Sequence, residues 1–250
     1  MRTTADARAR SNMIPIRDDT PRYTTPYITY FLIALNVAVF LFELSVGKGS
    51  NGALNSLIHQ FGVVPRRFSA DISGLRVDLV GAFLPIFTSM FLHASWLHII
   101  GNMWVLWIFG DNIEDYLGHF PYLVFYFFCG FAGAIAHIFL NAGSRVPSVG
   151  ASGAIAGIMG AYLVLYPKAK VLTIVPLIIF FTFWWLPAWI VLGYWFLIQF
   201  VIGATSIAYS SQTSGGVAFW AHVGGFLAGG LLIKLLPRHR PQGWRSNAWG

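Results

Sequence analysis

Residues 150–166 read GASGAIAGIMGAYLVLY, an apolar run in which Ser152 lies near the start, directly between Ala151 and Gly153. Its four glycines are spaced three or four residues apart, a pattern typical of a membrane helix packed closely by its neighbours. A hydroxyl group at membrane depth is costly without a partner, so Ser152 predicts either helix packing or a functional site. A second apolar run, from about 217 to 236, carries His222 near its start. Serine and histidine are therefore the candidate partners.

The composition is that of an integral membrane protein. Of the 250 residues, 56% are hydrophobic and 10% are charged, and the mean hydropathy is +0.65, whereas soluble domains carry about 25% charged residues. The net charge of +7 comes from Lys and Arg scattered through termini and loops, with no stripe that would predict nucleic-acid binding. The lone Cys129 excludes an intrachain disulfide. No motif predicts a metal or another cofactor.

Apolar runs long enough to cross a bilayer predict an all-α polytopic bundle with six spans. The predicted spans are about 27–44, 93–109, 121–140, 150–166, 187–203 and 217–236. We expect residues 1–26 to form a cytoplasmic tail, 45–92 an outer loop that is partly embedded in the membrane, and 237–250 a basic tail. The run from Val171 to Gly203 is too long for one straight span, so its helix is expected to begin near Pro187, where proline favours a break.

The distribution of basic residues predicts the orientation. If both termini are cytoplasmic, eleven of the sixteen Lys and Arg residues lie inside, as the positive-inside rule favours. The second, fourth and sixth spans then all run inward, and their first residues share one layer below the outer surface. Four polar residues fall in that layer: His98, Asn102, Ser152 and His222.

This layer predicts a catalytic dyad for acyl transfer. A neutral imidazole within hydrogen-bond reach can take the proton of a serine hydroxyl during attack, so we expect Ser152 to be the nucleophile and His222 the base. No Asp or Glu lies in the outer halves of these three spans, which excludes a serine triad with a carboxylate in the same layer.

The negative oxygen of a tetrahedral intermediate needs hydrogen-bond donors. His98 and Asn102 are four residues apart on one helix face and can form this oxyanion hole together with the backbone N–H of Ser152. Gly150 and Gly153 are expected to let a substrate backbone approach closely.

Each of these residues also has a plainer interpretation when taken alone. The glycines could serve only helix packing, the serine could cap its helix, and the histidines could be interhelical hydrogen-bond partners. Only their joint placement favours catalysis. Of the other histidines, His137 is interpreted as structural and His93 as a residue that could line a path for water. The remaining three are expected in solvated loops or tails: His59, His119 and His239.

Three motifs resemble those of the rhomboid intramembrane serine proteases. His93-Ala94-Ser95-Trp96-Leu97-His98-Ile99-Ile100-Gly101-Asn102 resembles the family's second-helix signature, Gly150-Ala151-Ser152-Gly153 its nucleophile motif, and Ala221-His222-Val223-Gly224-Gly225 with Gly229 its base and packing motif. The resemblance covers about 27–236 and implies the same site roles. It also implies that Gly225 and Gly229 let the sixth helix approach the fourth, and that Glu114 has a structural role.

The resemblance implies cleavage of single-span membrane proteins near the outer edge of their transmembrane helix, in contact with membrane lipid. It favours a bacterial inner membrane, with the helix from 187 as a lateral gate and residues 210–216 as a lid. At Leu84-Pro85 the chain lacks a Trp-Arg pair found in some members. Ala156 stands where some members place a ring that stacks on the base, so the resemblance does not say how His222 is held.

Two other functions compete with proteolysis. A non-catalytic protein of the same fold could bind and retain membrane helices, but the presence of both Ser152 and His222 disfavours it. A small transporter could line a pathway with these polar residues, but it would be expected to show inverted repeats, which the two halves of the sequence lack. The sequence predicts neither the physiological substrate nor the oligomeric state.

Overall fold

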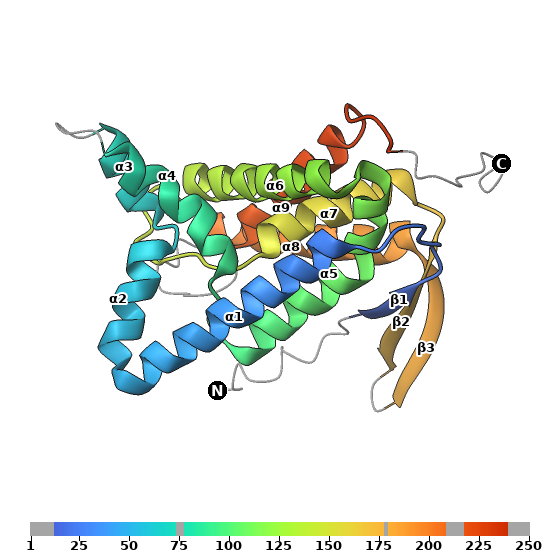
Figure 1. Cartoon of the computed structure of the whole chain (residues 1–250), viewed down its shortest axis with the longest axis horizontal. Helices are drawn as coiled ribbons and strands as arrows, with labels where there is room; N and C mark the ends of the chain where they lie inside the picture. The colour runs from blue at the N-terminus through green and yellow to red at the C-terminus, as the bar shows by residue number, and fades with distance from the viewer. Residues whose placement is uncertain (1–12, 74–77, 178–179, 209–217, 240–250) are drawn as a thin grey trace.

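The computed structural model describes residues 13–73, 78–177, 180–208 and 218–239 (Figure 1). Within these residues six helices form the main bundle: α1 (Tyr27–Gly49), α5 (Trp96–Leu117), α6 (His119–Leu140), α7 (Ser152–Leu165), α8 (Ala188–Ala208) and α9 (Phe219–Leu232). Each lies in the region of one predicted span. α7 contacts α5, α6, α8 and α9, so the helix that begins at Ser152 is the central one. The helical polytopic fold predicted from the sequence is confirmed.

The helices differ in length in a way that matters for the site. α1, α6 and α8 are each long and apolar enough to cross a membrane. α7 and α9 have only 14 residues each, which is about 21 Å of helix at 1.5 Å per residue. A hydrocarbon core is about 30 Å thick, so these two central helices are shorter than the bilayer. Their first residues can therefore lie below the membrane surface.

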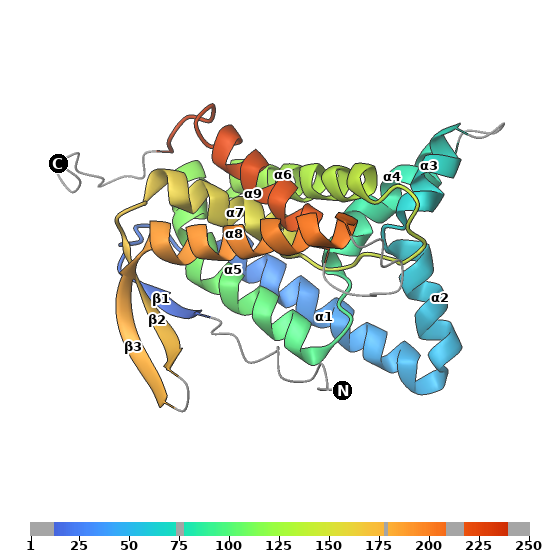
Figure 2. The same cartoon turned by 180° about the vertical axis from the view of Figure 1, so that it is seen from behind.

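The connection between α1 and α5 is largely helical. It contains α2 (Asn51–Phe61), α3 (Pro65–Ser73), α4 (Leu79–Thr88) and the 3-10 turn η1 (Ser89–Phe91). α4 with η1 meets α5 at an angle of 82°. α2 and α3 lie at one end of the bundle, as both views show (Figures 1 and 2).

A three-stranded antiparallel sheet lies at the opposite end of the molecule (Figure 1). β2 (Lys170–Leu177) pairs with β3 (Phe180–Pro187), and β1 (Ile14–Asp18) pairs with β2. The sequence analysis expected a broken helix here and did not anticipate strands. The β-branched and aromatic residues of this segment favour strands, and proline disfavours a helix interior. α8 begins directly after Pro187, close to the predicted start.

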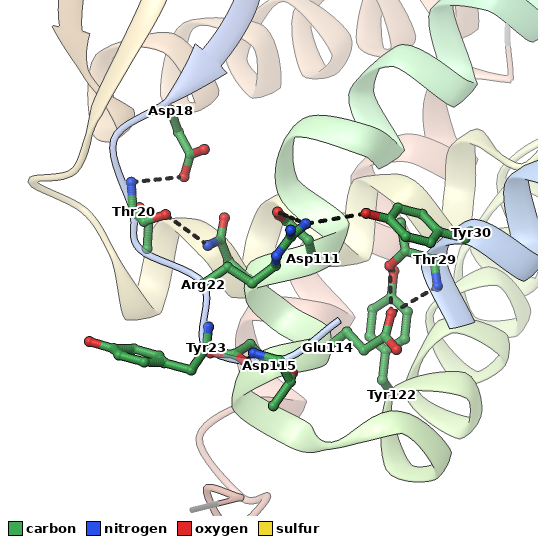
Figure 3. A network of polar contacts seen from close by, with 12 residues as sticks. Asp18, Thr20, Arg22, Tyr23, Thr29, Tyr30, Asp111, Glu114, Asp115 and Tyr122 are labelled. Atoms are coloured by element: carbon green, nitrogen blue, oxygen red, sulfur yellow. Dashed lines mark hydrogen bonds and ion pairs between the residues drawn. The ribbon is translucent and has the colours of Figure 1, made fainter. Parts of the chain in front are cut away.

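The N-terminal segment is tied to the bundle at the same end. The indole Nε1–H of Trp104 in α5 donates to the carbonyl of Pro15 in β1 at 2.7 Å. The Asp115 carboxylate accepts hydrogen bonds from the backbone N–H groups of Tyr23 and Thr24 at 3.2 and 2.7 Å (Figure 3). The segment before α1 therefore packs on the last turns of α5.

Glu114 holds the first turn of α1, and its carboxylate is completely buried. It accepts from the backbone N–H groups of Ile28 and Thr29 at 2.9 and 2.8 Å and from the Thr29 hydroxyl at 2.8 Å (Figure 3). Because the first N–H groups of a helix have no partner within the helix, a carboxylate at this position is stabilising. This geometry supports the structural role that the resemblance implied.

Glycines bring α9 into backbone contact with α7. A Cβ atom on Gly225 or Gly229 would overlap the carbonyl oxygen of Gly153 or Gly157 respectively. Such close approach is possible only without side chains, which is the use that membrane helices make of small residues. The contact runs along both helices and fixes their first turns against each other.

Candidate active site

Local signals in the chain set where α5 and α7 begin. The Ser95 hydroxyl caps α5 by accepting from the backbone N–H of His98 at 3.2 Å, as serine at an N-cap commonly does. Before α7, Gly150 has a φ of +126°, a backbone conformation that favours glycine. Its N–H donates to the carbonyl of Ser89 at 2.8 Å. The chain thus turns sharply into α7, whose first residue is Ser152.

The predicted serine and histidine are in direct contact. Ser152 Oγ lies 2.7 Å from Nε2 of His222, and His222 is 7% exposed. The two side chains come from helices held together by the glycine contact described above. This distance is within the range expected for a nucleophile and its base.

Two residues of α8 hold the other side of the His222 imidazole. The second ring nitrogen, Nδ1, lies 2.7 Å from Oε1 of Gln199. The Trp195 ring lies beside the imidazole, with 5.6 Å between centroids and a tilt of 35°. Gln199 and Trp195 therefore hold His222 in place, which the sequence motifs alone did not reveal. One signal in the sequence pointed to them: Gln199 is the single amide in the apolar stretch from Ala188 to Gly203.

His98 and Asn102 converge on Gly150, two residues before Ser152. A Cβ atom on Gly150 would lie 2.7 Å from Nε2 of His98 and 3.5 Å from Nδ2 of Asn102. The structure thus brings together three of the predicted site residues around the turn into α7. Gly153, by contrast, is buried, and a Cβ there would lie 3.5 Å from the carbonyl oxygen of Ala221. Its surroundings are those of a helix-packing residue, and its contact with substrate stays a prediction.

His93 is part of the same polar cluster. Its Nδ1 lies 3.3 Å from the carbonyl oxygen of Phe91, and its Nε2 lies 3.0 Å from Nδ2 of Asn102. A carbonyl oxygen only accepts, so Nδ1 carries the proton and Nε2 accepts from the Asn102 amide. The backbone N–H of His93 donates to the buried Glu43 carboxylate of α1, at 3.1 Å to Oε2. His93 therefore orients the Asn102 side chain, a role that the sequence analysis did not assign.

A cavity of about 30 Å³ adjoins Ser152. Among the residues that line it are Ser89, His137, Ser148 and Gly150. A water molecule needs roughly 10–15 Å³ measured in this way and two or more polar partners, so the cavity has room for water beside the serine. His137, interpreted above as structural, lies at this cavity. Within the described ranges, no cluster of three or more His, Cys, Asp or Glu side chains is placed to hold a metal ion.

Comparison with known proteins identifies the family. A model of the Rhomboid domain matches residues 80–239, which is more than half of the chain and includes Ser152, His222, His98 and Asn102. The chain belongs to the rhomboid family. This rhomboid is 30% identical over 155 residues to "Rhomboid protein 1, mitochondrial" of Saccharomyces cerevisiae, covering 59% of this chain and 39% of the yeast protein.

Two further relatives show how widely the similarity extends. "Rhomboid protease GluP" of Bacillus subtilis is 32% identical over 138 residues, covering 55% of this chain and 24% of GluP. "Presenilin-associated rhomboid-like protein A, mitochondrial" of Danio rerio is 36% identical over 100 residues, covering 39% and 26% of the two chains. The rhomboid described here thus spans between about a quarter and two fifths of the length of these three relatives. Two of the three are named as mitochondrial, so the expectation of a bacterial inner membrane gains no support. The apolar helices indicate a membrane location.

Proposed function

We propose that this rhomboid is a serine endopeptidase that hydrolyses peptide bonds in or near the transmembrane helices of single-span membrane proteins. The observation that carries the proposal is the 2.7 Å contact between Ser152 Oγ and His222 Nε2 near the beginnings of two short helices. The family and its member GluP, named a protease, support the same reading. The protease domain would comprise 27–236, with cytoplasmic segments on either side.

The proposed reaction uses the dyad twice. In the first half, Nε2 of His222 takes the hydroxyl proton while Ser152 Oγ bonds to the substrate carbonyl carbon, and the same proton then passes to the leaving amine. In the second half, water attacks the resulting ester, again with His222 as base. The cavity beside Ser152 is suitably placed to hold this water. Neither half requires a cofactor.

The developing oxyanion would be stabilised from two sides. His98 and the Asn102 amide converge on the turn at Gly150, and the N-terminus of α7 offers N–H groups that have no partner within the helix. Removing one such donor typically costs about 10²–10³ in kcat. Each of these donors therefore has a catalytic role that can be tested separately from the dyad.

A substrate helix must partly unfold to reach this site, because a helix keeps its carbonyls in internal hydrogen bonds. Small or helix-breaking residues near the cleaved bond should therefore favour cleavage. A non-catalytic helix-binding protein of the same family is the alternative function. It does not require a serine and a histidine at hydrogen-bond distance, and for this reason we favour the protease.

The test uses purified wild-type protein, Ser152→Ala and His222→Ala, each reconstituted in liposomes with a labelled single-span substrate. His59→Ala, a change in the outer helix α2, is the matched control. We expect cleavage by the wild type and the control only. Cleavage by Ser152→Ala would refute the mechanism, and binding of substrate helices without cleavage by the wild type would favour the alternative function.

A further inference from the structure

The imidazole of His222 is held by a helix other than its own. Gln199 and Trp195 lie four residues apart on α8, so their side chains share one face of that helix. Gln199 Oε1 contacts Nδ1 of His222 at 2.7 Å, and the Trp195 ring lies against the same imidazole. His222 thus has Ser152 on one nitrogen and α8 on the other.

The contact with Gln199 sets which nitrogen carries the proton. An amide oxygen only accepts hydrogen bonds, so Nδ1 must be the protonated nitrogen of the neutral ring. Nε2 is then left with a free lone pair 2.7 Å from the Ser152 hydroxyl. The opposite tautomer would place a hydrogen on Nε2 and could not accept the serine proton. A wrong tautomer is costly: in serine triads, replacing the orienting carboxylate by an amide lowers kcat by about 10⁴.

α8 is a peripheral helix. Figure 2 shows it at the surface of the bundle, in front of α7. Only 22% of its span is buried, against 33% for α6. Its ring contacts with α9 include Phe196 with Phe226, at 4.7 Å between centroids, and Phe200 with Trp220, at 5.9 Å. If α8 moves away from α9, Gln199 and Trp195 leave His222 together.

We propose that Gln199 is a positioning residue that holds His222 in its base-competent tautomer only while α8 is packed against α9. The inference rests on the proposed function, because it concerns the base of the same dyad. It means that the dyad is complete when α8 is closed and loses its orientation when α8 opens. Opening of α8 and proton transfer are therefore mutually exclusive steps.

The test compares three α8 variants of the full chain in liposomes. Gln199→Leu removes the acceptor at similar volume, Gln199→Glu keeps an acceptor and adds a charge, and Leu197→Ala is the matched control because Leu197 is 57% exposed on the same helix. We expect Gln199→Leu to lower kcat on the order of 10- to 100-fold with little change in KM, because Nδ1–H of the buried His222 ring loses its acceptor. Leu197→Ala should resemble the wild type.

A pH profile separates positioning from mere packing. In Gln199→Glu the carboxylate accepts from Nδ1–H and also favours protonated imidazole, so the acid limb of the kcat profile should move to higher pH while much of the activity at alkaline pH is kept. Equal loss in Gln199→Leu and Gln199→Glu with no movement of the acid limb would overturn the inference. So would equal kcat in Gln199→Leu and Leu197→Ala.

A second measurement does not depend on the substrate. The rate at which a fluorophosphonate labels Ser152 should fall in Gln199→Leu by a factor similar to the fall in kcat, with Ser152→Ala as the unlabelled reference. If the wild type is labelled and cleaves substrate but Gln199→Leu does so equally well, the inference alone fails. If Ser152→Ala cleaves like the wild type, the proposed function fails first. Thermal unfolding of each variant ensures that folded protein is compared.

Discussion

The close contact between α6 and α9 predicts a large effect of one added methyl group. A Cβ atom on Gly133 of α6 would lie 2.5 Å from the carbonyl oxygen of Ala221, the residue before His222. The shortest tolerable separation is about 3.0 Å and an ordinary contact is about 3.4 Å, so Gly133→Ala requires a shift of 0.5 to 0.9 Å. α9 cannot yield easily, because α7 fills the space on its other side with backbone atoms.

Two magnitudes follow from this shift. Overpacking of this kind costs about 1–3 kcal/mol of stability. A shift of 0.5 to 0.9 Å at Ala221 also displaces the neighbouring His222 from its 2.7 Å contact with Ser152 Oγ. A misplacement of about 1 Å at a reacting group can cost roughly 10² in rate. We therefore expect Gly133→Ala to lower kcat about 10- to 100-fold.

The assay combines cleavage of a single-span substrate in liposomes with thermal unfolding in detergent. Gly230→Ala is the matched control, since a Cβ there meets its nearest atom at 3.4 Å, an ordinary contact. The control should keep the activity and unfolding temperature of the wild type. If Gly133→Ala and Gly230→Ala behave alike, the argument that backbone contact fixes the dyad is wrong.

Three further predictions concern the gate, the oxyanion hole and the sheet. A Cβ on Gly203 would lie 3.4 Å from Cβ of Phe219, close to disulfide geometry, so a disulfide in the Gly203→Cys/Phe219→Cys variant should lock α8 against α9. In the oxidised variant, fluorophosphonate labelling of Ser152 should persist while cleavage of a transmembrane substrate falls. Reductant should restore the cleavage. Cleavage that is unchanged in the oxidised protein would count against the gate. His93→Phe should lower kcat about fivefold, because the Asn102 amide loses an acceptor worth about 1 kcal/mol; a wild-type kcat would contradict this. Burial raises the pKa of Asp18 above its ordinary value of 3.8, so the folded state binds this proton more tightly than the unfolded state. The associated stability is full below pH 3.8 and is lost as pH rises through the raised pKa. Asp18→Asn should therefore show a smaller fall in unfolding temperature over this pH range, and a fall equal to that of the wild type would refute the assignment.

The sequence predicted the helical bundle well because apolar length is a strong signal in membranes. Each predicted span overlaps one helix of the bundle, and α8 begins directly after Pro187. The hairpin of β2 and β3 was missed because an uncharged run such as 171–186 fits a buried helix or a strand equally well by hydropathy. Its strand pairing depends on contacts between residues that hydropathy does not report. The predicted lid, residues 210–216, lies outside the described residues.

The candidate site was predictable in part for a similar reason. Ser152 and His222 could be paired because both lie near the starts of spans that were predicted to run in the same direction and so to share a depth. Gln199 could not be paired with His222 in this way, because the helix face that carries Gln199 depends on where α8 begins and on how α8 packs against α9. Glu43 was missed because it lies on α1, outside the three helices that were compared.

The sheet also has a consequence for how the chain is made. Ile14 of β1 pairs with Ile174 of β2, 160 residues later in the chain. At 5–20 residues per second, translation of that interval takes roughly 8 to 32 s. During this time β1 has no partner strand, although the four helices of the main bundle that precede β2 (α1, α5, α6 and α7) are already made. The first strand therefore finds its partner only after the helix that begins at Ser152 has been synthesised.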